Sequence, residues 1–291
     1  MKTCTVAMFP GQGAQFQGMG RNLFDKYEYH MRLTQQVLGY SLVQVCEGET
    51  RVLNRTEFTQ PALFVINILY YLESLEKHGT NIEIFVGHSL GEYCALFAAG
   101  AFSFETALAI VQERGRCMAL CSEGAMAAVI GLKLEQVESL LADSKLRDLT
   151  IANFNSPTQF IISGDKSELS QFKEKVLNAK GIYHPLQVNG AFHSKRMANI
   201  AEEFKGFLER IDIFPLKASV LSNVTADFYP LNNREQLIDL LVKQLSYPVR
   251  WQQCIEKLHA DKHIIGFEYG PKPVVGPLAK KILGERITLM E

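Results

Sequence analysis

The chain has 291 residues, of which 47% are hydrophobic and 21% charged, and these proportions are typical of a globular protein. Thirty basic and 31 acidic residues give a formal net charge of −1, which disfavours binding to nucleic acid or to an anionic membrane. The longest apolar runs fall short of the ~20 residues that span a bilayer. Six scattered cysteines form no CxxC pair, which predicts no metal site. Three disulfides are the alternative to reduced thiols, but a chain this long can bury a core without them, so we expect reduced thiols in a cytoplasmic protein.

The first part of the chain alternates between strands, glycine-rich turns and helices. A strand is predicted over residues 3–9 and is followed by the turn Pro10-Gly11-Gln12-Gly13. The next elements are an apolar helix over about 59–75, a strand over 82–86, a helix ending near 100 and a helix over 105–121. Strand, turn and helix in this order are typical of an α/β fold.

The pattern changes near Gly124. The predicted strands cover 125–132, 149–152, 159–163 and 182–188, and the predicted helices cover 134–142 and 166–177. The resulting β-α-β-β-α-β order is that of a ferredoxin-like unit. The first pattern then resumes with a helix after Ser194, a strand over 218–224, a helix from Arg234 and a terminal strand and helix within 266–283. We therefore predict a large α/β domain of residues 1–123 and 194–291 with an inserted ferredoxin-like small domain, residues 124–193.

Residues 87–91, Gly-His-Ser-Leu-Gly, fit the G-x-S-x-G pattern of a nucleophile elbow. Chance alone gives about 0.1 matches in a chain of this composition, so the pattern depends on its context. It follows a predicted strand and precedes a helix, where a strained turn exposes the hydroxyl of Ser89. We predict that Ser89 is a nucleophile and that the large domain is α/β-hydrolase-like. The alternative is an ordinary glycine-rich loop whose serine caps the helix.

A serine hydroxyl needs a base to react at neutral pH, and His193 is the favoured candidate. It lies in Gly190-Ala191-Phe192-His193-Ser194, where the small domain returns to the large one, and domain junctions commonly form clefts. His88, next to Ser89 in the elbow, is expected to point away from it and to be structural. From the residues alone, His193 is either a general base or an ordinary buried histidine.

Two further features suit acyl chemistry. The turn around Gln12 offers free backbone N–H groups, as an oxyanion hole requires, but a simple tight turn is equally consistent. Arg114 interrupts an otherwise apolar helix. It is either a solvated surface residue, which sequence physics alone favours, or a bidentate fork for a carboxylate.

Several motifs together resemble the malonyl-CoA:acyl-carrier-protein transacylases. They are FPGQG (9–13), TQPAL (59–63), GHSLGEY (87–93), RG (114–115), GAMAAVIGL (124–132), ANFNSP (152–157), AFHS (191–194), SNV (222–224) and PVRW (248–251). The resemblance runs from residue 7 to about 285, in the family's order, and is greatest to free-standing acyltransferases that serve polyketide synthases in trans. It departs at Gly270-Pro271-Lys272-Pro273, where relatives usually carry Gly-Pro-Gly.

The resemblance implies the reaction and the residue roles. Ser89 would carry malonyl from malonyl-CoA as an ester to the phosphopantetheine thiol of an acyl carrier protein, with His193 as base and then acid. The remaining roles that it implies are an oxyanion hole from the N–H groups of Gln12 and Leu90, a carboxylate site at Arg114, substrate contacts from Gln60, Phe192 and Asn155, and a main-chain carbonyl of Asn223 that orients His193. It implies a monomer without a bound cofactor. Two alternatives remain, an acyl hydrolase that clears carrier proteins and the malonyl transacylase of fatty acid synthesis.

Overall fold

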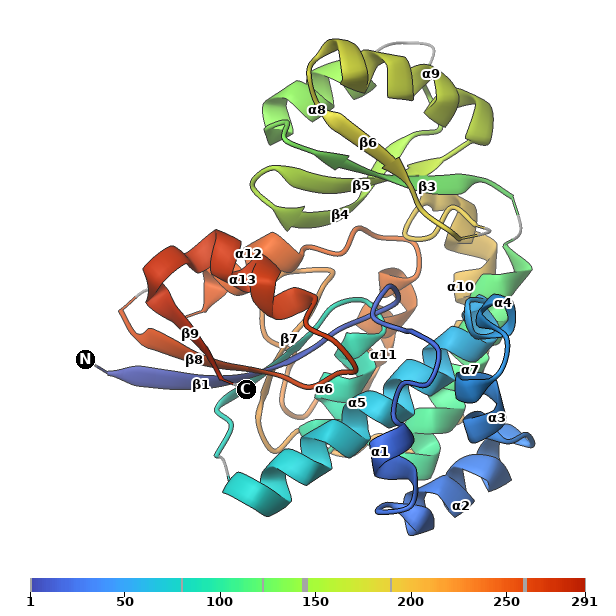
Figure 1. The fold of residues 1–291 in the computed structure, drawn as a ribbon, viewed down its shortest axis with the longest axis vertical. Coiled ribbons are helices and arrows are strands. Elements are labelled where there is room, and N and C mark those ends of the chain that lie inside the picture. Colours follow the sequence, from blue (N-terminus) through green and yellow to red (C-terminus); the bar gives the residue numbers. More distant parts are fainter. Residues whose placement is uncertain are drawn as a thin grey trace.

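The computed structural model describes residues 2–79, 81–121, 123–142, 146–188, 190–258 and 261–290. Within these residues the chain forms a mixed α/β fold with two separate sheets, one above the other in Figure 1. The larger, lower sheet has the strand order β7-β2-β1-β8-β9, and the smaller, upper sheet has the order β4-β5-β3-β6. Every described helix is too short or too polar to cross a lipid bilayer.

The larger sheet is parallel throughout. Its strands are β1 (Thr3–Phe9), β2 (Ile84–Gly87), β7 (Ser219–Leu221), β8 (His263–Glu268) and β9 (Ile287–Met290). The helical segments that accompany it are α1 (Arg21–Phe24), α2 (Glu28–Leu38), α3 (Leu42–Glu47), α4 (Thr50–Leu53), α5 (Thr56–His78), α6 (Gly91–Ala98), α7 (Phe104–Leu120), η1 (Lys195–Met197), α10 (Ala198–Leu208), α11 (Arg234–Gln244), α12 (Trp251–Lys257), α13 (Val275–Leu283) and η2 (Gly284–Arg286).

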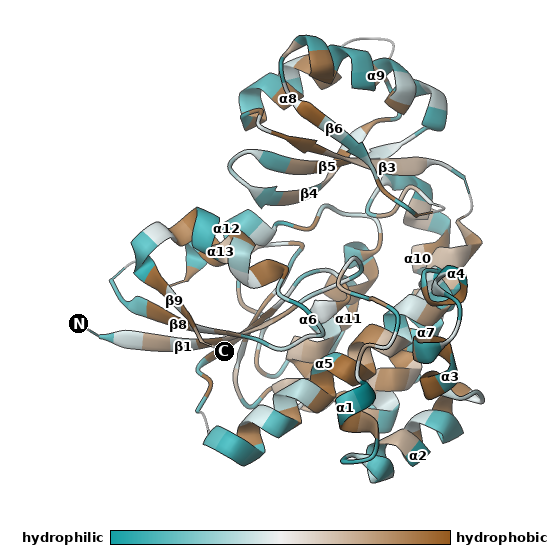
Figure 2. Ribbon diagram, viewed as in Figure 1, coloured by the Kyte–Doolittle hydropathy of each residue, from teal (hydrophilic) through white to brown (hydrophobic). Residues whose placement is uncertain are grey.

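Both faces of this sheet are buried at its central strands β1 and β2, as is usual where helices cover a parallel sheet, whereas the edge strand β9 is mostly exposed. Successive side chains of β1 enter different cores, since side chains alternate along a strand. Phe9 packs with α5, α6 and α7, whereas Met8 packs with α12 and α13. In Figure 2 the apolar colouring follows α5 through its middle and gives way to polar colouring at its C-terminal end, where the helix becomes exposed.

The smaller sheet is antiparallel throughout and has two helices on one face. Its elements are β3 (Ala125–Ile130), α8 (Leu134–Leu141), β4 (Thr150–Ser156), β5 (Gln159–Gly164), α9 (Lys166–Asn178) and β6 (Ile182–Pro185). Ala127, Val129 and Ile162 pack under α8 and α9. Met126 and Ala128, which point the other way, join the main core instead. This second face looks toward the larger sheet (Figure 1).

The predicted elements agree with these bounds within a few residues, with three differences. Strand β4 continues through Ser156, whereas the prediction ended at residue 152, so Asn153 and Asn155 are strand residues. Strand β7 is shorter than predicted and stops at Leu221. Helix α12 and strand β9 were not predicted, because a seven-residue helix and a four-residue edge strand leave little periodicity to detect.

Candidate active site

Ser89 lies in a sharp turn between the end of β2 at Gly87 and the start of α6 at Gly91. Its backbone φ of 51° is in the left-handed region, which is strained for a residue with a side chain. Both flanking glycines are required by space, because a Cβ on Gly87 would overlap the main chain of Gly91, and one on Gly91 would overlap that of Phe9. The turn has the geometry that the G-x-S-x-G pattern predicts.

His193 faces the serine across 104 residues of sequence. Ser89 Oγ and His193 Nε2 are 2.8 Å apart, and His193 Nδ1 is 2.8 Å from the carbonyl oxygen of Gln244. A carbonyl only accepts, so Nδ1 carries the proton and Nε2 offers its lone pair to the serine hydroxyl. Burial, and after it the charge of Arg114, lowers the pKa of His193 to about 3. The imidazole is therefore neutral at physiological pH, as a general base must be.

The prediction that a main-chain carbonyl of Asn223 orients His193 is wrong, since the carbonyl belongs to Gln244. Gln244 is the last residue of α11, where carbonyl groups lack partners within the helix and are free to accept. Asn223 instead supports the serine turn. Its Oδ1 accepts from the backbone N–H of Ser89 at 2.7 Å, and its Nδ2 donates to the carbonyl of Gly87 at 2.8 Å.

Arg114 is fully buried on α7 and points its guanidinium at the serine. Nη1 donates to Gln60 Oε1 at 2.6 Å, and Nη2 donates to Gln244 Oε1 at 2.9 Å and to Ser89 Oγ at 3.1 Å. The guanidinium carbon also lies 5.2 Å from the ring centre of Tyr93. Within the described residues it pairs with no carboxylate, and its Nε has no acceptor. The arginine is thus a buried cation held by neutral groups, not the surface residue that sequence physics alone favoured.

Glu92 and Gln244 connect these groups and were missed by the sequence analysis. Gln244 Nε2 donates to Glu92 Oε2 at 2.6 Å and to the carbonyl of Ser89 at 2.8 Å. Glu92 Oε1 accepts from Tyr229 Oη at 2.6 Å and from the backbone N–H of Asn223 at 3.1 Å. Burial raises the pKa of Glu92 to about 7. The available signal was a carboxylate in the otherwise small and apolar start of α6, whereas Gln244 gave none.

The remaining predicted residues lie around the same cleft, which has a volume of about 380 Å³. Gln12 and Leu90 line it beside Ser89, and within the described residues their backbone N–H groups donate to no acceptor. Phe192 and Gln60 also line it. Asn155 lies at its edge and contacts His88, whose Nε2 is 2.8 Å from Asn155 Oδ1.

The side chains that line the cleft include both apolar and polar ones. The inner face of the smaller sheet contributes mainly apolar side chains, among them Met126, Ala128 and Ile161, together with polar ones such as Asn153. The larger sheet contributes the polar groups around Ser89. A second hollow of about 670 Å³ lies between α10 and α11 and contains none of the predicted residues. The chemistry that these sequence motifs predict therefore gathers in one place, between the two sheets.

One group of side chains has the composition of a metal site. Glu113, Cys117 and Glu203 bring their ligand atoms within 4.8 Å of one another. Arg116 already contacts both carboxylates, at 2.8 Å from Glu113 and at shorter distance from Glu203. The guanidinium supplies the positive charge there, so this cluster is an ion-pair network.

Comparison with known proteins decides the family. Residues 6–285 match the model of the acyl transferase domain. The chain belongs to this family. The match covers the range that the sequence motifs predicted, and the resemblance to malonyl transacylases is confirmed.

Relatives of this acyl transferase include proteins of polyketide biosynthesis. The malonyl CoA-acyl carrier protein transacylase BaeC of Bacillus velezensis is 41% identical over 282 residues, which are 96% of this chain and 96% of BaeC. The polyketide biosynthesis protein PksE of Bacillus subtilis is also 41% identical over 96% of this chain, but the chain spans only 36% of PksE.

Solved structures agree with this assignment. The malonyl CoA-acyl carrier protein transacylase of Burkholderia pseudomallei superposes with a TM-score of 0.92 at 38% identity, over 96% of this chain and 97% of that one. A malonyl-transacylase in complex with its type II polyketide synthase acyl-carrier protein has a TM-score of 0.92 at 30% identity, over 98% of this chain and 94% of that one.

Replacing Glu92 with glutamine should slow acyl transfer without unfolding the protein. The amide nitrogen of the new glutamine replaces one of the two carboxylate oxygens. It then faces the backbone N–H of Asn223 if it replaces Oε1, or Gln244 Nε2 if it replaces Oε2, and both of these are donors. A misplaced Gln244 then disturbs Ser89, His193 and Arg114 together. We expect kcat to fall by about 10- to 100-fold, the effect of unsatisfied buried polar groups. Tyr229→Phe is the control, because it removes one hydrogen bond from Glu92 without adding a donor, and an equal loss in both variants would contradict this explanation.

The same variant should change how stability depends on pH. Glu92 keeps its proton up to about pH 7 when folded, against a usual pKa of 4.5, so its stabilising contribution is complete below pH 4.5 and is lost as pH rises through 7. His193 shifts stability in the opposite sense but is present in both proteins. The difference in unfolding free energy between wild type and Glu92→Gln should shrink by about 3 kcal/mol across this range. Denaturant titrations at several pH values measure it, and a constant difference would contradict the raised pKa.

Proposed function

We propose that this acyl transferase is a malonyl-CoA:acyl-carrier-protein transacylase in which Ser89 carries the malonyl group as an ester. The observation that supports this most strongly is the pairing of a Ser89–His193 hydrogen bond of 2.8 Å with a buried guanidinium only 3.1 Å from the same hydroxyl. A serine–histidine pair suits acyl transfer. A buried cation with no carboxylate partner among the described residues suits an acyl group that brings its own carboxylate.

The proposed first half-reaction needs no group from outside the cleft. His193 Nε2 takes the proton of Ser89 as Oγ attacks the thioester carbonyl, and the N–H groups of Gln12 and Leu90 stabilise the oxyanion. The carbonyl of Gln244 stabilises the imidazolium that forms. When the C–S bond breaks, His193 returns the proton to the CoA thiolate. The second half-reaction reverses these steps with the phosphopantetheine thiol of the carrier.

In this proposal the guanidinium of Arg114 binds the malonyl carboxylate. Gln60 and Gln244 fix the guanidinium in place, and its bond to Ser89 Oγ is exchanged for bonds to the substrate. Holding the carboxylate also keeps the ester carbonyl near the oxyanion donors and away from water. Phe192 and Asn155 would limit the space around the acyl group.

We further propose that the carrier domains belong to a polyketide synthase that is served in trans. BaeC and PksE, both named for polyketide biosynthesis, are 41% identical to this chain. The malonyl transacylase of fatty acid synthesis is the second candidate, because the malonyl CoA-acyl carrier protein transacylase of Synechocystis is 36% identical over 97% of this chain. Both candidates share the chemistry and differ in the carrier. An acyl hydrolase for uncharged chains is disfavoured, since it would gain nothing from burying Arg114.

The proposed domain division places residues 1–123 and 194–291 in an α/β-hydrolase-like large domain and residues 124–193 in a ferredoxin-like small domain. Support comes from the parallel order β7-β2-β1-β8-β9 with its strand–turn–helix at Ser89, and from the antiparallel order β4-β5-β3-β6 with two helices on one face. All the groups of the proposed mechanism come from one chain, consistent with a monomer. The cytoplasm, where CoA thioesters and carrier proteins meet, is the proposed location, and no bound cofactor is needed.

Incubation with malonyl-CoA should add one malonyl mass to the wild-type protein and none to Ser89→Ala. Intact-protein mass spectrometry measures the adduct. Ser103→Ala, which removes an exposed helix-capping hydroxyl outside the cleft, is the matched control and should be labelled like the wild type. Labelling of Ser89→Ala would mean that another residue accepts the acyl group.

Arg114→Ala should lose malonyl-CoA turnover while acetyl-CoA, which has no carboxylate, is spared. A bidentate charged pair contributes roughly 1.5–3 kcal/mol, or about one to two decades in specificity. Arg114→Lys should recover only part of it, because an ammonium cannot form two parallel hydrogen bonds. The measurement is the ratio of kcat/KM for the two thioesters, and an unchanged ratio would show that the carboxylate is recognised elsewhere.

A further inference from the structure

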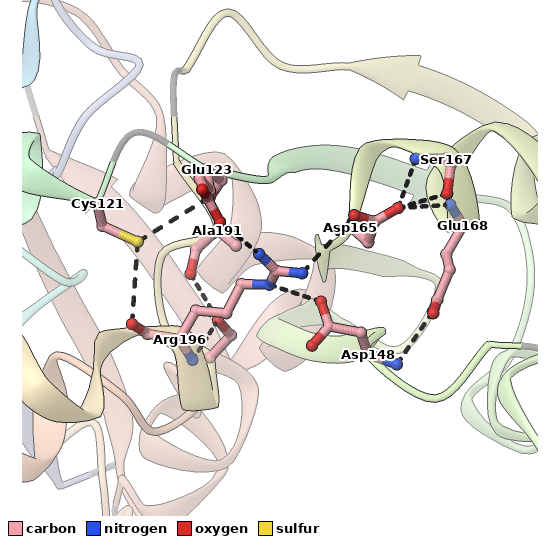
Figure 3. Close-up of polar contacts among 9 residues, drawn as sticks. Cys121, Glu123, Asp148, Asp165, Ser167, Glu168, Ala191 and Arg196 are labelled. Atoms are coloured by element: carbon pink, nitrogen blue, oxygen red, sulfur yellow. Dashed lines mark hydrogen bonds and ion pairs between the residues drawn. The ribbon is translucent and has the colours of Figure 1, made fainter.

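Arg196 lies three residues after His193, in the short segment η1, and extends its guanidinium toward the smaller sheet (Figure 3). Its Nε donates to Asp148 Oδ2 at 2.7 Å. Nη2 is 3.7 Å from Asp165 Oδ2, and Nη1 is 3.5 Å from Glu123 Oε2. Asp148 precedes β4, and Asp165 begins α9. Arg196 with these three carboxylates, called here the Arg196 cluster, therefore joins the segment that carries His193 to the smaller sheet.

The two acidic segments next to the smaller sheet are held in place by bonds that do not involve Arg196. Asp165 Oδ1 caps α9 by accepting from the backbone N–H groups of Ser167 and Glu168, at 2.7 and 3.2 Å, which leaves Oδ2 for the arginine (Figure 3). The backbone N–H of Asp148 donates to Glu168 Oε2 at 3.0 Å. Gly164 lets the two acidic segments meet, because a Cβ there would overlap the carbonyl oxygen of Asp148. Arg196 thus enters a preformed anionic site.

The main chain of Arg196 is tied to the residues around His193. Its N–H donates to Ser194 Oγ at 3.3 Å, and Ser194 Oγ donates to the carbonyl of Ala191 at 2.6 Å. Its carbonyl accepts from Cys121 Sγ at 4.0 Å. A shift of the arginine would therefore be passed to residues 191–194, which include His193.

The smaller sheet is attached to the rest of the chain at a second place. Val249, just before α12, bonds to β4 through its main chain, accepting from Phe154 N–H at 2.9 Å and donating to the carbonyl of Ala152 at 2.8 Å. The cleft lies between this sheet and the Ser89 turn. Together with the His88–Asn155 bond and the packing of Met126 and Ala128 in the main core, the two attachments hold this wall of the cleft near Ser89.

We propose that Arg196 is a positioning residue that sets the width of the acyl-transfer cleft by holding the smaller sheet against the His193 segment. The inference rests on the proposed transacylase function. With the cluster intact, the wall of the cleft packs closely on the bound pantetheine arm and excludes water from the seryl ester. Without it the acceptor thiol binds less well, and more of the ester is lost to water. His193 keeps its own bonds to Ser89 and to the carbonyl of Gln244, so the loading step changes less than the transfer step.

The test compares Arg196→Met with Arg116→Met. Arg116 is a matched control, because it is also a partly exposed arginine paired with two carboxylates, but Glu113 and Glu203 lie on α7 and α10 and not on the smaller sheet. Each protein is first loaded with malonyl-CoA. We then measure how much of the seryl ester is transferred to a pantetheine acceptor and how much is hydrolysed by water. In Arg196→Met we expect hydrolysis relative to transfer, and the KM for the acceptor, to rise roughly three- to tenfold, the scale of an ion-pair network, with a smaller change in loading rate.

The labelling rate of Cys121 gives a second readout that needs no activity. Its thiol lies 4.0 Å from the carbonyl of Arg196 and is half-buried, whereas the five other cysteines are buried. Arg196→Met should label with a maleimide several-fold faster than wild type or Arg116→Met.

If Arg196→Met does not fold, the milder variants Asp148→Asn and Arg196→Lys can be used to test the proposal. Asp148→Asn should shift both readouts in the same direction and should add little in combination with Arg196→Met. Arg196→Lys should be intermediate, since a single ammonium cannot bridge the cluster. If the wild type takes up no malonyl, the proposed function fails, while Cys121 labelling still reports on the cluster. If the wild type loads but the Arg196 variants match Arg116→Met in both readouts, the positioning role is overturned.

Discussion

Gln244 contacts the nucleophile, the base and the cation of the proposed chemistry. Its main-chain carbonyl accepts from His193, its side-chain oxygen accepts from Arg114, and its side-chain nitrogen donates to the carbonyl of Ser89 and to Glu92. Each polar atom of a buried amide is satisfied in this way, which avoids the cost of an unpaired group. The relative positions of the nucleophile, the base and the cation are consequently fixed by one residue at the end of α11.

The surroundings of Arg114 explain how a buried cation is kept ready for a ligand. Gln60, Gln244 and Ser89 accept from it, but each is neutral, so the direction of the guanidinium is fixed while its charge is left uncompensated. Burial lowers the pKa of Arg114, yet arginine remains protonated in any accessible pH range. A carboxylate in direct contact would compete with the substrate. The buried carboxyl group of Glu92 is separated from Arg114 by the Gln244 amide.

The features that could be predicted from the sequence are those encoded by residues close together in the chain. The Ser89 turn is encoded by residues within five positions, and the two glycines are needed by the contacts that the turn makes. Arg114 was recognisable because a charge interrupts an apolar helix, although its burial depends on how α5 and α7 pack. The identity of the carbonyl at His193 was out of reach, because a main-chain oxygen carries no residue signature and Gln244 lies 51 residues away. The short elements α12 and β9 were missed for a related reason, since tertiary packing rather than periodicity stabilises them.

A transfer between two thiols makes opposing demands on such a cleft. The proposed seryl ester must be open to a long pantetheine arm and yet closed to water, and neither sheet provides both properties. The reactive groups lie around Ser89 beside the larger sheet, and most of the smaller sheet's contribution to the cleft is apolar. Exclusion of water therefore depends on the distance between the two sheets, which no single motif encodes. The main-chain bonds at Val249 and the ion pairs of the Arg196 cluster are among the described contacts that hold the two sheets together.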